Sequence, residues 1–109
     1  MKLRITEYLD ADLSAELWCC NRCGTEIYDL RDNYKKGCLI AEKPLEEVHP
    51  PLVEGQAFSF TPDSDFCRLI EFYCPNCGTV IENEYLPPGH PITHEIDLDV
   101  DALKKKHGL

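Results

Sequence analysis

The sequence predicts a small, mostly β domain with little helix, built on two hairpins that face each other and followed by an extended C-terminal arm. Two Cys-x-x-Cys-Gly units, at 20–24 and 74–78, stand between short runs rich in β-branched and aromatic residues, as hairpins require. From residue 92 onward apolar residues alternate with polar, mostly acidic ones. Together these features are typical of a zinc-ribbon-like domain in which two zinc knuckles hold one ion.

The first elements are short. Residues 2–9, "KLRITEYL", alternate well enough to predict a first strand. Residues 15–30 are expected to form a strand, a knuckle and a second strand. Residues 33–44 predict a turn at Lys36-Gly37 and then a short apolar run.

The middle of the chain is less regular. Pro50 and Pro51 predict an irregular stretch over 45–56, because proline cannot donate to a ladder. Residues 57–66 predict a short strand and an Asp- and Pro-rich turn. The clearest element is the hairpin over 67–86, whose two arms are joined by the second knuckle.

The C-terminal part is predicted to be an arm. "PPGHP" (87–91) breaks the chain, and the period of two over 92–100 predicts a strand with one apolar and one acidic face. Asp101 is expected to cap a final helical turn. We therefore expect one structural domain, with a zinc-ribbon-like part at 1–90 and a partner-contacting arm at 91–109.

Composition limits the function. The chain has 109 residues and 43% hydrophobic residues, which fits one soluble domain. No apolar run reaches the roughly 20 residues that span a bilayer, and the N-terminus lacks a signal-peptide core, so we expect a cytoplasmic protein and no membrane contact. A net charge of −9 disfavours nucleic acid as a partner.

The cysteine units form a near-repeat, since both segments read Cys-x-x-Cys-Gly-Thr-x-Ile. The repeat predicts two hairpins facing each other across a shared ion, with two separate sites as the alternative. A tetrahedral Zn²⁺ takes four ligands, and the expected ones are Cys20, Cys23, Cys74 and Cys77. A Cys19-x3-Cys23 pairing also exists, but in an extended "LWCC" only one of Cys19 and Cys20 reaches the ion.

Four thiolates predict a structural role for the ion. Catalytic zinc keeps one position open for water or substrate, whereas a closed site staples distant segments together. A rubredoxin-type iron electron carrier is a rival interpretation, which the colour of the purified protein would separate. A stand-alone zinc ribbon that binds protein or nucleic acid is another.

Other candidate residues carry weaker signals. Cys19, Cys38 and Cys67 are typical of small buried side chains rather than nucleophiles. His49, and the pair His90 and His94, lie in proline-rich turns. The two alternatives for these histidines are imidazoles that satisfy backbone groups and a second metal site or base.

Several longer motifs carry a family resemblance. "NYKKGCLI", "HPPL" and "FSFTPDSDFCRLIEFYCPNCGTVIENEYLPPGHPITHEIDLD" resemble the small zinc-binding subunit of acetone and acetophenone carboxylases, over about residues 18–103. The more specific parts are "EFYCPNCG" and "EYLPPGHPITHEIDLD". The acetophenone type is the closer comparison, because the acetone-type subunit is longer.

The resemblance implies a non-catalytic, zinc-bearing accessory subunit of a hetero-oligomeric, ATP-dependent carboxylase. It implies that hydantoinase/oxoprolinase-like large subunits are the partners and hold the ATP and substrate sites. The family's metal ligands carry over onto Cys20, Cys23, Cys74 and Cys77. An alternative is that His90, His94 or Glu95 completes a partner's active site.

Overall fold

The computed structural model describes residues 1–43 and 67–109. Within these ranges seven short strands form two antiparallel sheets, accompanied by one 3₁₀ turn and one α-helix. The first sheet has the strand order β1-β2-β3-β4 and the second has β5-β6-β7. The predicted fold class, mostly β with little helix and two facing knuckles, is confirmed.

The first sheet is a meander of four strands: β1 (Lys2–Arg4), β2 (Leu9–Asp12), β3 (Leu17–Cys20) and β4 (Glu26–Asp29). The strand–knuckle–strand unit expected over 15–30 is confirmed. The single strand expected over 2–9 is wrong, because the chain turns back after β1. The backbone N–H groups of Ile5 and Thr6 both donate to the Leu9 carbonyl, at 2.9 and 3.1 Å.

A 3₁₀ turn, η1 (Tyr34–Gly37), connects the two sheets and contains the turn expected at Lys36-Gly37. Asn33 caps it, since its side chain accepts from the Lys35 backbone N–H. A Cβ on Gly37 would overlap the carbonyl oxygen of Ile27 in β4. Glycine therefore allows η1 to pack directly on the first sheet.

The second sheet contains β5 (Leu39–Lys43), β6 (Arg68–Tyr73) and β7 (Val80–Leu86). The hairpin predicted over 67–86 is confirmed, with Phe72 opposite Glu82 and a bulge next to the knuckle. The elements expected over 45–56 and 57–66, and His49 with them, lie outside the described residues.

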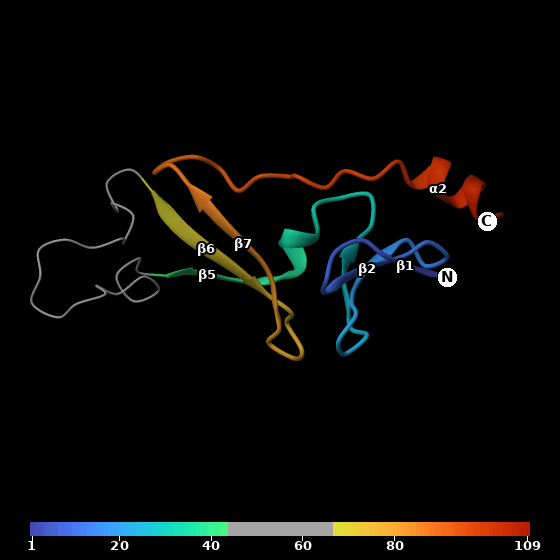
Figure 1. Ribbon diagram of the computed structural model, residues 1–109, viewed down its shortest axis with the longest axis horizontal. Helices are drawn as coiled ribbons and strands as arrows, with labels where there is room; N and C mark the ends of the chain where they lie inside the picture. The colour runs from blue at the N-terminus through green and yellow to red at the C-terminus, as the bar shows by residue number, and fades with distance from the viewer. Residues whose placement is uncertain (44–66) are drawn as a thin grey trace, which may run out of the picture.

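Residues 87–99 form no strand, so the strand expected over 92–100 is wrong. The segment runs along one side of the molecule to α2 (Val100–Lys106), as Figure 1 shows. Burial alternates only over 95–100, where Ile96, Leu98 and Val100 pack inward with no ladder partner among the described residues. The cap of α2 is Asp99 rather than Asp101, because the Asp99 side chain accepts from the Ala102 N–H.

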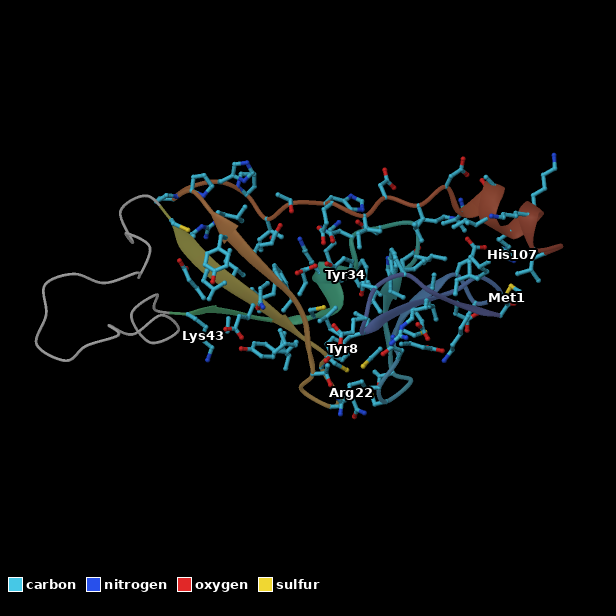
Figure 2. The ribbon with its side chains drawn as sticks, in the orientation of Figure 1. Met1, Tyr8, Arg22, Tyr34, Lys43 and His107 are labelled. Atoms are coloured by element: carbon cyan, nitrogen blue, oxygen red, sulfur yellow. The ribbon has the colours of Figure 1, made fainter. Side chains whose placement is uncertain are left out.

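The two sheets share one hydrophobic core. Buried side chains from both sheets, from η1 and from the start of α2 form a single cluster, with the Trp18 and Tyr34 rings edge to face at 5.7 Å. Side chains fill the space between the sheets in Figure 2. No helix in the described ranges has the length and apolar character needed to cross a membrane.

Candidate metal centre

The ends of two hairpins lie side by side, one from each sheet (Figure 1). Each knuckle is closed by the same pair of backbone hydrogen bonds. In the first, Cys20 N–H donates to Thr25 at 2.9 Å and Gly24 N–H donates to Cys20 at 2.8 Å. In the second, the backbone N–H of Cys74 donates to the Thr79 carbonyl at 2.8 Å, and the N–H of Gly78 donates to the Cys74 carbonyl at 3.1 Å. The sequence repeat is thus a repeat of structure.

Both glycines have a left-handed backbone. The φ angle is 77° at Gly24 and 75° at Gly78, which glycine adopts without steric cost. This turn brings the residue after each glycine back beside the first cysteine of the unit, where its carbonyl accepts that cysteine's N–H. The two knuckles then present their thiols to one common point.

The four sulfur atoms meet between the hairpins. The Sγ atoms of Cys20, Cys23, Cys74 and Cys77 all lie within 4.8 Å of one another. The separations are 3.7 Å for Cys20–Cys77 and 3.6 Å for Cys23–Cys74. A tetrahedral zinc with Zn–S bonds of about 2.3 Å requires sulfur atoms about 3.8 Å apart. The donor set therefore fits a tetrahedral, thiolate-preferring metal ion.

The site has a buried side and an exposed side. Cys20 and Cys74 are buried, whereas Cys23 and Cys77 are exposed. Burial raises the pKa of Cys20 to about 12, even though backbone N–H groups oppose it. Hydrogen bonds from Thr25 lower the pKa of Cys23 to about 5, and those from Thr79 lower the pKa of Cys77. A divalent cation would offset the cost of ionising the buried thiols.

The other cysteines lie apart from this cluster. Cys19 is buried with its Sγ 3.9 Å from the Leu17 carbonyl, and burial raises its pKa. Cys38 is buried against the Tyr34 carbonyl, and burial raises its pKa to about 11. The Cys67 Sγ lies 3.9 Å from the Arg68 carbonyl. Of the neighbours Cys19 and Cys20, the structure brings Cys20 to the cluster.

The described histidines do not form a second metal-binding cluster. His90 and His94 are exposed, and the His90 Nδ1 lies 2.7 Å from the Pro91 carbonyl. Glu95 is turned inward, where it accepts from the Tyr34 hydroxyl at 2.5 Å. Across residues 1–43 and 67–109, the four cysteines are the only group of three or more metal-ligating side chains close enough to share an ion.

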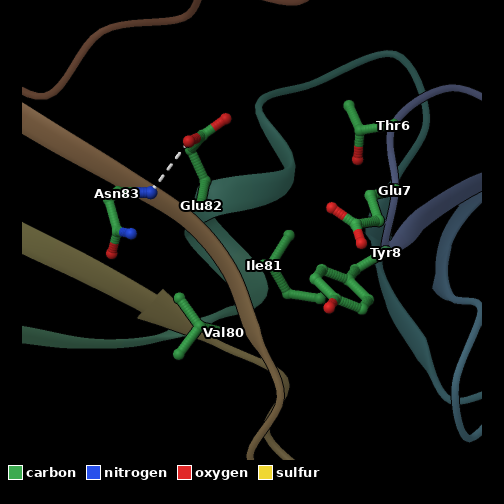
Figure 3. A pocket seen from close by; sticks show the side chains of 7 residues that line it. All are labelled: Thr6, Glu7, Tyr8, Val80, Ile81, Glu82 and Asn83. Carbon is green, nitrogen blue, oxygen red and sulfur yellow. Dashed lines mark hydrogen bonds between the residues drawn. The ribbon is translucent and has the colours of Figure 1, made fainter.

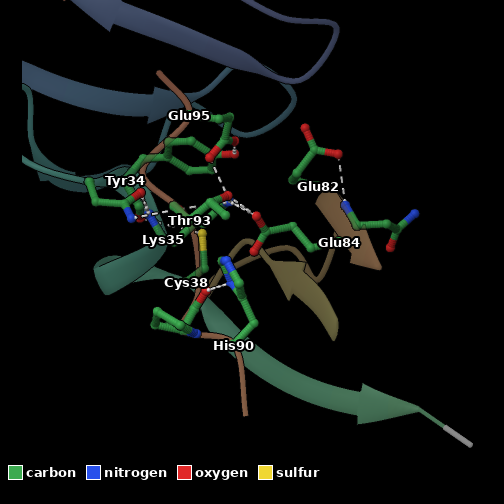
Figure 4. A network of polar contacts seen from close by, with 11 residues as sticks. Tyr34, Lys35, Cys38, Glu82, Glu84, His90, Thr93 and Glu95 are labelled. Atoms are coloured by element: carbon green, nitrogen blue, oxygen red, sulfur yellow. Dashed lines mark hydrogen bonds and ion pairs between the residues drawn. The ribbon is translucent and has the colours of Figure 1, made fainter. Parts of the chain in front are cut away.

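The sequence did not predict an ionic network between η1, β7 and the C-terminal segment. Lys35 is 1% exposed, and its Nζ lies 2.8 Å from Glu84 and 2.6 Å from Glu95 (Figure 4). The ammonium group also lies 5.0 Å from the centre of the Phe72 ring. "YKKG" reads as a basic surface turn, and nothing local in it marks one lysine as buried.

A cleft lies between the β1–β2 turn and β7 (Figure 3). Its lining comprises Thr6, Glu7, Tyr8, Val80, Ile81, Glu82 and Asn83. No cysteine or histidine lines it, so it does not extend the metal centre. Among the described residues, the buried Thr6 hydroxyl has no hydrogen-bond partner.

Comparison with known proteins shows to which family the chain belongs. It matches the family model of the acetone carboxylase gamma subunit over residues 1–108. It is 53% identical over 105 residues to the acetophenone carboxylase beta subunit of Aromatoleum aromaticum, across 96% of this chain and 81% of that protein. It is 26% identical over 85 residues to the acetone carboxylase gamma subunit of Xanthobacter autotrophicus, across 74% of this chain and 46% of that longer protein. These matches confirm the resemblance carried by the motifs: the chain belongs to the acetone carboxylase gamma subunit family.

Proposed function

We propose that this chain is a zinc-binding, non-catalytic subunit of a hetero-oligomeric carboxylase. One observation carries the proposal. Four thiols from two sheets converge with sulfur separations of 3.6 and 3.7 Å, close to the edge of a zinc–thiolate tetrahedron. The ligands we propose are Cys20, Cys23, Cys74 and Cys77.

The role of such a site is structural. Four protein thiolates fill the coordination sphere and leave no position for water or substrate, which a hydrolytic or Lewis-acid role needs. Cys20 and Cys77 are 57 residues apart, and Cys23 and Cys74 are 51 apart. Holding these pairs together lowers the entropy that the chain loses on folding. This stabilises a domain whose hydrophobic core is small. The ion would fix the angle between the two sheets.

The names of the relatives support a carboxylase assembly. The two matching proteins are named as subunits of acetophenone carboxylase and of acetone carboxylase. We propose that the partners of this chain are large, hydantoinase/oxoprolinase-like subunits that hold the ATP and ketone sites. In this proposal the small subunit stabilises and organises them in the cytoplasm, with the arm at 91–109 as its contact.

Metal analysis of the assembled complex tests the proposal. The chain is co-expressed with its large subunits, purified as the complex and assayed for zinc, iron and subunit ratio. We expect one zinc per small subunit, no ferric-thiolate colour, and loss of the metal and of the assembly in a Cys20→Ser/Cys74→Ser variant. Stoichiometric iron with a red colour would favour the electron-carrier alternative. A metal-free, fully assembled wild-type complex would overturn the zinc proposal.

Activity is measured in the same preparations. The variants His90→Ala and His94→Ala remove the exposed imidazoles without touching the thiols. We expect both to assemble and to turn over substrate like the wild type. Normal assembly with lost turnover would instead assign this chain a part in a partner's active site.

A further inference from the structure

The repeat of the two knuckles extends one residue beyond the glycine, to a threonine. Thr25 and Thr79 follow Gly24 and Gly78 and immediately precede β4 and β7. The carbonyl of each threonine accepts the N–H of the first cysteine in its unit. Its side-chain hydroxyl contacts the second cysteine.

The contacts to sulfur are short and equivalent. The Thr25 Oγ1 lies 3.1 Å from the Cys23 Sγ, and the Thr79 Oγ1 lies 3.0 Å from the Cys77 Sγ. The backbone N–H of each threonine donates to the same sulfur. A metal-bound thiolate has no proton to donate, so in the loaded site both hydroxyls are donors to sulfur.

These two sulfurs are the ones that face solvent. Cys23 and Cys77 are exposed, whereas Cys20 and Cys74 are covered by the core. Four thiolates around a divalent cation carry excess negative charge, and hydrogen-bond donors beside the ligands spread that charge and fix ligand orientation. The hydroxyls thus contact the two thiolates that the core does not shield from solvent.

The geometry points to Thr25 and Thr79 as paired positioning residues of the metal centre, whose hydroxyls hold the exposed thiolates Cys23 and Cys77 on the ion. This inference rests on the proposed metal function and adds residues that are not ligands.

The test uses the full chain and two matched substitutions. Thr→Val at both positions removes the hydroxyls and keeps the backbone groups and the branched shape, whereas Thr→Ser keeps the hydroxyls. Thr6→Val is the control, because that hydroxyl has no hydrogen-bond partner within 1–43 and 67–109. Zinc affinity is measured by competition with a chromophoric chelator, and the sulfur-to-metal charge-transfer band is recorded on Co²⁺-loaded protein.

We expect the Thr25→Val/Thr79→Val protein to bind zinc about 10- to 100-fold more weakly, as for other residues behind metal ligands, and its Co²⁺ band to shift. The Thr→Ser pair and Thr6→Val should match the wild type in both measurements. An unchanged affinity and band in the Val pair, or equal losses in the Ser pair, would overturn the inference. A wild-type chain that binds neither metal would overturn the proposed function instead.

Discussion

The ammonium group of Lys35 lies 2.6 Å from the carboxylate of Glu95 and ties the C-terminal segment to the second sheet. The same nitrogen lies 2.8 Å from Glu84 in β7 and donates to the Thr93 carbonyl at 3.1 Å. In Figure 1 this segment and the knuckles lie on opposite sides of the molecule. The chain is therefore held at two places, by polar contacts that join η1, β7 and the C-terminal segment, and by the four thiols that join the two sheets.

Lys35→Met should destabilise the chain by about 3 kcal/mol, because it removes a buried cation and leaves Glu84, which is 11% exposed, without its ion-pair partner. Urea unfolding of the metal-loaded chain measures this. Lys36→Met is the control, since that side chain is 56% exposed beside Asp32 and exposed ion pairs contribute little to stability. A triple variant that adds Glu84→Gln and Glu95→Gln should recover part of the loss. Equal effects of the two lysine substitutions would contradict the buried network.

The network also predicts acid sensitivity. Burial opposes ionisation of Glu95, but hydrogen bonds from Lys35 and Tyr34 outweigh it, so the Glu95 pKa lies below its ordinary value of 4.5. A carboxyl whose pKa is lowered by folding contributes stability above its unfolded pKa and loses it as pH falls through the folded pKa. The stability gap between wild type and Glu95→Gln should thus be constant above about pH 5.5 and should shrink below pH 4.5.

Urea midpoints of the two proteins across this range check the prediction. Both carry the same cysteines, so acid release of the metal affects both and cancels in the difference. Glu42→Gln, at an exposed position of β5, is the control and should differ little from wild type at any pH. A gap that persists unchanged to low pH would show that the Glu95 charge is not what stabilises the fold.

Removing the metal should weaken the contact between the two knuckles and leave the polar contacts of the C-terminal segment in place. With free zinc at about 1,000 times its Kd, binding stabilises a chain by about 4 kcal/mol, and chelation should cost that amount in urea unfolding. Native-state hydrogen exchange localises the change. The Gly24 and Gly78 amides, which close the knuckles, should lose protection first, while the Leu103 amide in α2 should keep it. A uniform loss of amide protection across the chain would mean that the polar contacts around Lys35 do not hold the C-terminal segment without the ion.

Gly37→Ala should disturb the packing of η1 on the first sheet. The new Cβ would overlap a backbone carbonyl, that of Ile27, and a backbone atom cannot rotate away as a side chain does. Overpacking of this kind costs about 1–3 kcal/mol. Lys36→Ala, on the same turn but at an exposed side chain, should cost much less. Wild-type stability in Gly37→Ala would contradict the close approach of η1 and β4.

Local patterns predicted the hairpins but not the reversal near the N-terminus or the path of the arm. The knuckles could be predicted because cysteine spacing, glycine and flanking β-branched residues all act within a dozen positions. Residues 2–9 and 92–100 also alternate, yet alternation reports only which side is buried. It contains no information on whether a neighbouring strand is present. The burial of Lys35 depends on Glu84 and Glu95, 49 and 60 positions away, so no local signal marks it.

The arm at 91–109 offers the last prediction, that its outward side contacts the partner subunits. Removing the arm is an ambiguous test, because it also removes Glu95 and the buried Val100. Ile92 is 38% exposed and Asp97 is exposed, so substitutions there change the outward side and keep Glu95 and Val100 in place. Ile92→Ser/Asp97→Lys should weaken assembly with the large subunits at least tenfold, the effect of about 1.4 kcal/mol, at an unchanged urea midpoint.

Leu39→Ser is the control for the apolar part of this change, because Leu39 on β5 is 57% exposed and is likewise replaced by serine. Binding is measured by titrating the zinc-loaded small subunit against the isolated large subunits. If Leu39→Ser weakens assembly and the arm variant does not, the contact lies on the β5 edge of the second sheet. The arm would then serve only to fasten the two sheets of its own chain.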